Sequence, residues 1–210
     1  FKKGVLLMRV AALITAAGLS SRMGRFKPLL SVGKMSIAQR VVQTFRRAGV
    51  DTVVMITGNN ADALEAHLEG NGVIFLRNEK YASTQMLDSI KIGLEYLRGR
   101  CDAVLFTPVD IPLFKLSTVR ALLSCGAAEA CPVCRGGTGH PILLGTDLFP
   151  GIFAYSGERG LMGALESMNA EFFRVEVDDE WMLMDTDTPG EYEALLKKFY
   201  GEDSDEKKDN

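Results

Sequence analysis

The sequence predicts an α/β protein whose central, mostly parallel sheet is covered by helices on both faces. In the first half of the chain, short apolar segments alternate with longer segments in which apolar residues recur at helical spacing. The apolar segments are hydrophobic at successive positions, which is typical of strands buried on both faces. A length of 210 residues suits one domain, which we expect at 9–200, with a disordered charged tail at 201–210.

The elements of the first half follow one another in a regular order. An apolar strand begins at Ala11 and breaks at Gly18, and a helix then starts after Ser36, forms a capping box with Gln39 and stops at Gly49. After it we expect a strand over 52–57, a helix with Ala61, Leu64 and Leu68 on one side, a strand over 73–76, a helix over 85–97 and a strand over 103–107.

The second half is less regular. We expect a helix over 116–123, a strand over 129–133, a flexible glycine-rich loop over 136–139, an apolar segment over 142–144, a half-exposed strand over 173–177 and an extended segment over 182–184. Thr188, Pro189 and Glu191 then form a helix start, because a capping residue is followed by proline and, three residues on, by glutamate.

Composition excludes several classes of function. A net charge of −3 and a pI of about 5.5 give a field that repels nucleic acid, so we expect no nucleic-acid partner. No apolar run approaches membrane-spanning length, and Arg9 interrupts the apolar stretch that follows Lys2 and Lys3, so we expect neither a membrane span nor a secretory signal. We therefore expect a cytoplasmic protein.

The four cysteines, Cys101, Cys125, Cys131 and Cys134, are unevenly spaced and are expected to be reduced thiols. Cys131 and Cys134 form a CxxC pair in an extended segment, whereas a zinc site needs four ligands and a thioredoxin-type pair opens a helix. We interpret these residues as core or strand-edge cysteines.

The loop after the first strand is the first candidate site. Arg22, Arg25 and Lys27 bring positive charge close to a strand end, where backbone N–H groups can also bind phosphate. The loop matches neither the P-loop signature nor GxGxxG, which argues against a GTPase, an ATPase or an NAD enzyme. The alternative is an ordinary solvated basic loop.

Asp110 strengthens the interpretation as a ligand site. It follows a buried strand and lies between two prolines, so its carboxylate is held at the sheet edge where open α/β sheets bind ligands. Carboxylate oxygens suit Mg²⁺. Asp185 and Asp187 form a second acidic pair, one of which could complete a metal site. All three could instead be turn or capping residues.

Four motifs stand in order along the chain: Ala-Ala-Gly-Leu-Ser-Ser-Arg-Met-Gly-Arg-Phe-Lys-Pro within 13–30, Pro-Val-Asp-Ile-Pro at 108–112, Gly-His-Pro at 139–141 and Asp-Thr-Asp-Thr-Pro at 185–189. Together they closely resemble the MobA-like NTP transferases, and within them most resemble the molybdenum cofactor cytidylyltransferases. The resemblance extends from about residue 9 to 199. It implies a three-layer α/β/α, Rossmann-like nucleotidyltransferase fold of the GT-A-like type.

The resemblance also implies roles for individual residues. Arg22 would meet the β- and γ-phosphates and Lys27 the α-phosphate, while Asp110 would hold Mg²⁺ with Asp187 as its companion. The implied nucleotide-binding set is Ala16, Ala17, Gly18, Ser20, Ser21, Arg22, Gly24, Lys27, Thr57 and Gly58, and the implied substrate-side set is Asn78, Ser89, His140 and Asp185. Alanine at position 17 resembles the cytidylyl branch, because the guanylyl branch usually has a second glycine there.

The implied reaction is transfer of CMP from CTP to the phosphate of molybdopterin cofactor, with release of pyrophosphate. A molybdoenzyme that receives the cofactor would be a further partner. The segments at 78–81 and 85–87 lack a proline, a glycine and a serine of the family pattern, which leaves the acceptor open. The alternatives are a nucleotidyltransferase that uses a different NTP and a sugar phosphate or other small phosphorylated metabolite, and a nucleotide-binding or chaperone-like module without turnover.

Overall fold

The computed structural model describes residues 8–205, and its centre is one eight-stranded sheet. From one edge to the other, its strands are β10 (Phe173–Glu176), β7 (Ala130–Cys134), β9 (Ile142–Gly145), β6 (Ala103–Pro108), β1 (Val10–Thr15), β4 (Thr52–Thr57) and β5 (Val73–Arg77), and β8 (Gly137–Thr138) pairs with β7. β9 is antiparallel to both of its neighbours, and the pairs β10–β7, β6–β1, β1–β4 and β4–β5 are parallel. The predicted mostly parallel sheet is confirmed.

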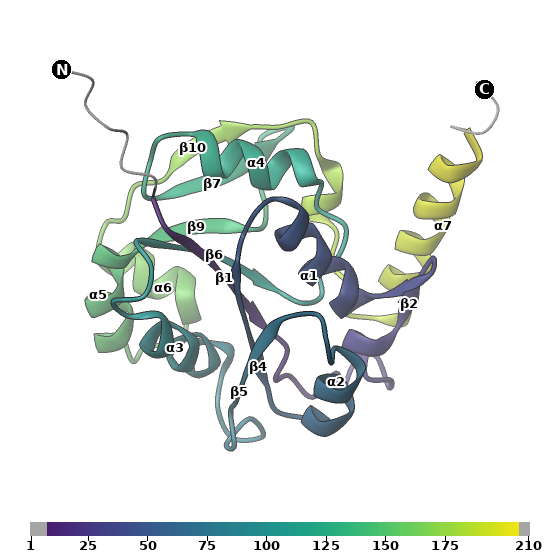
Figure 1. Ribbon diagram of the computed structural model, residues 1–210, viewed down its shortest axis with the longest axis horizontal. Helices are drawn as coiled ribbons and strands as arrows, with labels where there is room; N and C mark the ends of the chain where they lie inside the picture. The colour runs from purple at the N-terminus through teal and green to yellow at the C-terminus, as the bar shows by residue number, and fades with distance from the viewer. Residues whose placement is uncertain (1–7, 206–210) are drawn as a thin grey trace.

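Helices cover both faces of the sheet and give three layers (Figure 1). One face packs against α1 (Ile37–Arg47), α2 (Ala61–His67) and α4 (Leu116–Ser124), and the other against α3 (Met86–Leu97), α5 (Phe149–Ala154) and α6 (Gly160–Ser167). Alternate side chains of β1 reach the two cores, so that Ile14 packs on the first face and Leu13 on the second. Helix α7 (Pro189–Asp205) packs Leu195 against the first core.

Two predicted helix starts are confirmed by their hydrogen bonds. Ser36 Oγ accepts from the backbone N–H of Gln39 at 3.1 Å, and Gln39 Oε1 accepts from the backbone N–H of Ser36 at 3.0 Å, which closes the capping box of α1. At α7, the carboxylate of Glu191 accepts from the backbone N–H of Thr188 at 2.7 Å. These local pairs fix where the two helices begin.

Three expectations for the second half differ from the structure. Within the expected flexible loop 136–139, β8 pairs antiparallel with β7, because the chain turns back and the N–H of Gly139 donates to Pro132 O at 3.1 Å. The expected extended segment 182–184 lies mostly in a 3₁₀ helix, η3 (Glu180–Leu183). The fully buried Asp179 caps η3, since its Oδ1 accepts from the N–H of Trp181 at 3.1 Å.

The third difference concerns the expected tail at 201–210. Helix α7 extends to Asp205, because a helix that is already formed gains one hydrogen bond for each residue it adds. Residues 206–210 lie outside the described residues. The division of the chain at residue 200 stays a prediction.

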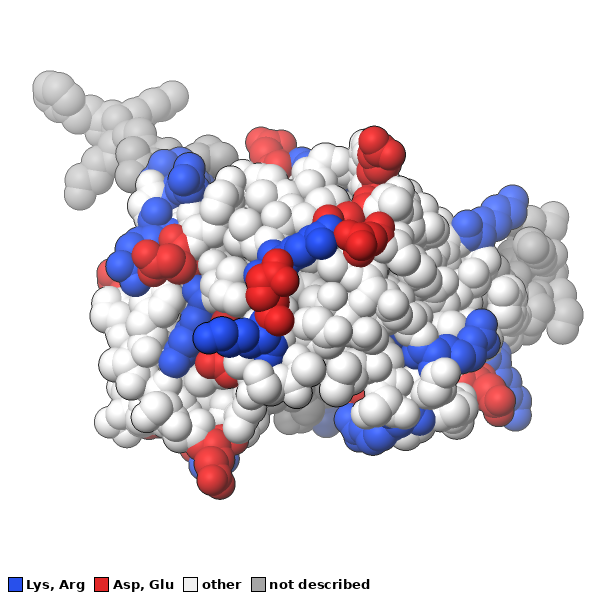
Figure 2. All heavy atoms as spheres, turned by 90° about the horizontal axis from the view of Figure 1, so that it is seen from below, with Lys and Arg blue, Asp and Glu red and all other residues white. Residues whose placement is uncertain are grey.

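The described cysteines match their interpretation: none forms a disulfide, and Cys131 and Cys134 are buried on β7. Within residues 8–205, no helix is both long and apolar enough to cross a membrane. Basic and acidic side chains are interspersed on the face shown in Figure 2, so this face carries no broad surface of one sign. Any strongly charged site on this face must therefore depend on a few neighbouring side chains.

Candidate active site

The loop after β1 folds back so that Lys27 returns to the strand end. Ser20 and Gly24 have positive φ angles of 53° and 66°, which turn the backbone sharply. The backbone O of Ser20 accepts from the N–H of Met23 at 3.1 Å, and Ser20 Oγ accepts from the N–H of Lys27 at 3.3 Å. Met23 is buried in the core and anchors the turn.

Lys27 is the centre of a charged cluster with Asp110, Asp187 and Arg22. Its Nζ lies 3.0 Å from Asp110 Oδ2 and 2.7 Å from Asp187 Oδ1. Arg22 Nη2 donates to the other oxygen of Asp187 at 2.5 Å. The side chain of Lys27 is only 12% exposed, whereas that of Arg22 is 69% exposed. The structure therefore joins four of the residues predicted to act on the nucleotide.

The two carboxylates meet because separate parts of the chain converge at one sheet edge. Asp110 lies just beyond the end of β6. The residue between them, Val109, is bonded to β1, because its N–H donates to Thr15 O at 3.0 Å. The buried hydroxyl of Thr186 donates to the backbone O of Asp110 at 3.1 Å. This bond holds the segment before α7 so that Asp187 faces Lys27.

The cluster changes the pKa values of its members. Burial acts to lower the pKa of Lys27, but the charges and hydrogen bonds of Asp110 and Asp187 outweigh it and raise this pKa. Loss of hydration acts to raise the pKa of Asp187, but Lys27 and Arg22 lower it overall. Asp185 differs, since loss of hydration and repulsion from neighbouring carboxylates raise its pKa. At neutral pH the Lys27–Asp187 pair is therefore ionised.

The donor set fits a divalent metal ion. Carboxylate oxygens from Asp110 and Asp187 already converge on one positive charge, the ammonium of Lys27, and such oxygens are the ligands that Mg²⁺ and Mn²⁺ prefer. Within residues 8–205, no three His, Cys, Asp or Glu side chains gather as a complete metal site. A metal ion here would complete its shell with phosphate oxygens and water.

A cavity of about 270 Å³ opens beside this cluster. Its lining includes ten residues predicted for the site: Ala16, Ala17, Gly18, Ser20, Ser21, Arg22, Lys27, Ser89, Asp110 and Asp187. We call it the phosphate cavity. Ser89, predicted on the substrate side, lines the same cavity as the loop that is predicted to bind the nucleotide.

Other predicted residues do not line the phosphate cavity. Thr57 is fully buried and its hydroxyl donates to Glu65 Oε1 at 2.8 Å. The buried Asn78 donates through Nδ2 to Ser89 Oγ at 3.0 Å and so supports a residue that does line the cavity. Gly24, Gly58 and Asp185 also lie outside the lining.

Gly58 has a steric role below the loop. A Cβ atom placed on it would lie 2.7 Å from Tyr81 Cβ and 2.9 Å from the carbonyl O of Ala17. Side-chain Cβ atoms do not approach backbone this closely, so only glycine fits beneath the loop. For Gly18, in contrast, no heavy atom of the described residues, apart from its chain neighbours, lies within 4 Å of such a Cβ. Gly18 lines the cavity, which leaves it open to a ligand.

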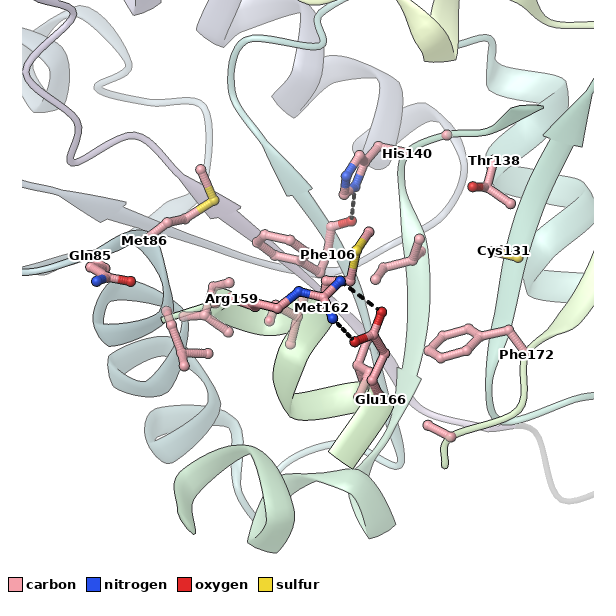
Figure 3. A pocket seen from close by; sticks show the side chains of 18 of the residues that line it. Gln85, Met86, Phe106, Cys131, Thr138, His140, Arg159, Met162, Glu166 and Phe172 are labelled. Atoms are coloured by element: carbon pink, nitrogen blue, oxygen red, sulfur yellow. Dashed lines mark hydrogen bonds and ion pairs between the residues drawn. The ribbon is translucent and has the colours of Figure 1, made fainter. Parts of the chain in front are cut away.

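His140 lies at a second, larger cavity of about 1120 Å³ (Figure 3). Its ring stands edge-on to Phe106 at 5.6 Å between centroids, and Nδ1 lies 3.4 Å from Phe106 O. Burial lowers the pKa of His140. The imidazole is therefore neutral at pH 7. We call this space the ring cavity, after the aromatic side chains in its wall.

Sequence reasoning missed two residues of the site. Thr15 lines the phosphate cavity, is 6% exposed, and its Oγ1 is the buried side-chain oxygen without a hydrogen-bond partner among the described residues. A threonine at the end of an apolar strand could have been the signal. Thr186, which bonds Asp110, gave no signal, because its role depends on a residue 76 positions away.

Comparison with known proteins agrees with this architecture. The MobA-like NTP transferase domain matches residues 12–172. A molybdenum cofactor cytidylyltransferase of Escherichia coli (strain K12) is 24% identical over 192 residues, which are 90% of this chain and 97% of that protein.

Two solved structures share the fold. A nucleotidyl transferase from Methanothermobacter thermautotroptrophicus has a TM-score of 0.79 at 22% identity and covers 91% of this chain and 98% of its own. Rv0371C of Mycobacterium tuberculosis H37Rv, solved in complex with manganese, has a TM-score of 0.70 at 23% identity. The match covers 90% of this chain and 98% of the mycobacterial chain. Since the domain match spans most of the chain, this protein is a nucleotidyltransferase and belongs to the MobA-like NTP transferase family.

Proposed function

We propose that the protein transfers CMP from CTP to the terminal phosphate of molybdopterin cofactor and releases pyrophosphate. The proposal rests on one observation above others, the convergence of Lys27, Asp110 and Asp187 at the phosphate cavity. The similarity over 90% of the chain to the molybdenum cofactor cytidylyltransferase of Escherichia coli supports the choice of nucleotide and acceptor. Ala17, where the guanylyl branch usually has glycine, also supports CTP.

The reaction is a displacement at the α-phosphorus of the nucleotide. An oxygen of the acceptor phosphate forms a new bond to that phosphorus, and the bond to the oxygen that bridges the α- and β-phosphates breaks. The electron pair of this bond leaves with pyrophosphate. A phosphate monoester has a second pKa of about 6 and is mostly dianionic at pH 7, so no general base is needed to remove a proton.

The protein contributes charge and position. Lys27 and Arg22 are held at the cavity by Asp187, and they can neutralise charge that increases on the phosphates during transfer. Asp110 and Asp187 would hold Mg²⁺, and such an ion supplies neutralisation of phosphate oxygens and of the leaving pyrophosphate. A related mycobacterial structure was solved in complex with manganese, which supports the use of a divalent ion by this protein.

The experiment measures pyrophosphate release with CTP, GTP, ATP or UTP, each with molybdopterin cofactor or with a sugar phosphate. We expect turnover with CTP and molybdopterin cofactor, and a loss of at least about 100-fold in Asp110→Ala. Asp51→Ala is the matched control, because Asp51 is exposed at the amino end of β4 and lies outside the site. It should stay within about twofold of the unmodified protein.

Three results would contradict the proposal. If the activity of Asp110→Ala stays within a few-fold of that of the unmodified protein, Asp110 does not hold the metal ion as assigned. Faster turnover with another NTP and a sugar phosphate would show that CTP and molybdopterin cofactor are the wrong substrates. Thermal stabilisation by CTP without pyrophosphate from any acceptor would indicate a nucleotide-binding module instead of an enzyme.

A further inference from the structure

The segment between η3 and α7 carries Asp187 to the edge of the sheet. On its amino side, the N–H of Met184 donates to Trp181 O at 3.2 Å. On its carboxyl side, the N–H of Thr188 donates to the carboxylate of Glu191 at 2.7 Å. Both bonds join the segment to its own flanking helices, η3 and α7. The position of Asp187 relative to the sheet therefore depends on the side-chain contacts of the segment.

Two side chains of this segment reach the sheet edge. Asp187 bonds Lys27 and Arg22. Thr186 donates from Oγ1 to the backbone O of Asp110 at 3.1 Å. An exposed arginine such as Arg22 holds a carboxylate weakly, because water screens the pair and the long side chain loses freedom. Thr186 is fully buried, so its bond to Asp110 is shielded from water.

The backbone of Asp110 is a firm point of attachment. The N–H of Val109 donates to the last carbonyl of β1 at 3.0 Å. On the other side, Pro112 restricts the backbone conformation of Ile111. The hydroxyl of Thr186 therefore fixes its own segment to the end of β6.

Lys27 is the other link between the two carboxylates, since its Nζ lies 3.0 Å from Asp110 Oδ2 and 2.7 Å from Asp187 Oδ1. In the proposed function Lys27 would bind the nucleotide, and a divalent ion would compete with its ammonium for the same oxygens. The bond from Thr186 uses a backbone oxygen of Asp110, which neither the phosphates nor the ion needs. This bond can therefore stay in place when Lys27 turns to the nucleotide.

We propose that Thr186 is a positioning residue for a divalent ion at Asp110 and Asp187: its buried hydroxyl keeps Asp187 close enough to Asp110 for both carboxylates to bind one ion. The inference rests on the proposed function and adds to its metal site a residue that touches neither metal nor substrate. Loss of a group that orients metal ligands typically costs about 10- to 100-fold in metal affinity. Thr186 acts through the backbone, so we expect an effect of about tenfold.

The test is a titration of the full chain with Mn²⁺ alone, followed by electron paramagnetic resonance. Thr186→Val removes the hydroxyl, keeps the shape of the side chain and should weaken Mn²⁺ binding about tenfold. Thr186→Ser keeps the hydroxyl and should stay within about threefold of the unmodified protein. Asp110→Asn removes a ligand and should weaken binding more than Thr186→Val does. If Asp110→Asn binds Mn²⁺ as the unmodified protein does, these carboxylates hold no ion and the inference is wrong.

Thr118→Val is the matched control. The hydroxyl of Thr118 is also fully buried and donates to Asp179 Oδ2 at 2.6 Å, but it lies outside the phosphate cavity and the charged cluster. This variant should lower Tm and leave the Mn²⁺ affinity within about twofold. Equal weakening in Thr186→Val and Thr118→Val would mean a general effect of destabilisation and would overturn the inference. Binding by Thr186→Ser as weak as that by Thr186→Val would overturn it too.

A double-mutant cycle with Lys27→Gln tests whether the two links support the same geometry. Without the ammonium of Lys27, the bond from Thr186 has to hold the carboxylates together by itself. Thr186→Val should therefore weaken Mn²⁺ binding by a factor that is about threefold larger in the Lys27→Gln background than in the unmodified protein. Equal factors in the two backgrounds would contradict the inference.

Pyrophosphate release separates this inference from the proposed function. With CTP and molybdopterin cofactor, Thr186→Val should raise the KM for Mg²⁺ more than it lowers kcat. If no NTP yields pyrophosphate but the Mn²⁺ affinities follow the expected order, the proposed function fails and the positioning role of Thr186 stands. If CTP is turned over but Thr186→Val binds Mn²⁺ as the unmodified protein does, the proposed function stands and this inference fails.

Discussion

Lys27 and Asp187, 160 positions apart in the sequence, are joined by a contact of 2.7 Å between Nζ and Oδ1. The same Nζ lies 3.0 Å from Asp110, so one cation connects the loop after β1, the end of β6 and the segment before α7. In the proposed function, the phosphates of the nucleotide would also bind this cation. If the proposal holds, a bound nucleotide would have to share or rearrange the contact between Lys27 and Asp187 that joins these segments.

Lys27→Gln should remove both the ion pairs and the catalytic cation. We expect kcat/KM for pyrophosphate release to fall about 100- to 1000-fold, because a preorganised charge at developing negative charge has an effect of this size. Thermal unfolding should show a loss of about 1–3 kcal/mol, since two partly buried carboxylates lose their partner. Lys34→Gln is the control, as Lys34 is exposed in the turn between β2 (Ser31–Val32) and β3 (Met35–Ser36). Activity within tenfold of the unmodified protein would rule out a catalytic Lys27.

The sequence was sufficient to predict where Lys27 and Asp110 would meet, because both follow buried parallel strands and such strand ends share one edge. It could not decide between Asp185 and Asp187. The bond from the hydroxyl of Thr186 to Asp110 O orients that segment, and no local pattern contains a contact over 76 positions.

The covering of the second face was predicted only in part. Helix α3 has a regular apolar stripe, whereas α5 is short and α6 begins at Gly160 without a side-chain cap. With neither a stripe nor a cap, these two helices had no strong local signal. The ring cavity, whose wall includes α6, was missed for the same reason.

Glu65 should make the free energy of unfolding depend on pH in the range where its carboxyl group titrates. The hydrogen bond from Arg77 is the main cause that lowers the pKa of Glu65 below 4.5, and Thr57 also contributes. A lowered folded pKa means that the ionised form stabilises the fold above about pH 4.5, and that this stabilisation is lost as pH falls through the folded pKa. Glu65→Gln should therefore lower Tm at pH 7, and the difference should shrink below pH 4.5.

Thermal unfolding from pH 3 to 8 checks this expectation. Glu69→Gln, a change at an exposed glutamate just after α2, is the control and should leave Tm nearly unchanged across the range. A Tm difference between Glu65→Gln and the unmodified protein that stays constant over the whole range would mean that the Glu65 charge does not contribute to stability.

Thr15→Val should weaken the binding of CTP without lowering the thermal stability of the protein. The hydroxyl of Thr15 is buried at the phosphate cavity and has no hydrogen-bond partner within residues 8–205, so a valine of the same shape should keep or raise Tm. If a ligand supplies the missing partner, the affinity for CTP should fall about two- to tenfold, as one hydrogen bond contributes about 0.5–1.5 kcal/mol. Thr118→Val is the contrast, because its hydroxyl donates to Asp179 at 2.6 Å and its loss should lower Tm. An unchanged CTP affinity in Thr15→Val would show that this hydroxyl does not bind the nucleotide.

Two glycine substitutions next to each other in space should have different effects. In Gly58→Ala, the new Cβ would lie 2.9 Å from the carbonyl O of Ala17, and backbone cannot yield as a side chain does. We expect a lower Tm, with about 1–3 kcal/mol lost, and weaker CTP binding because the loop moves. In Gly18→Ala the new atom meets no described residue other than its chain neighbours within 4 Å, so Tm should stay the same. A bound nucleotide would nevertheless meet this methyl group at the cavity wall, and CTP affinity should fall. Thermal unfolding with and without CTP measures both effects, and full CTP affinity in Gly18→Ala would mean that the nucleotide does not approach this loop.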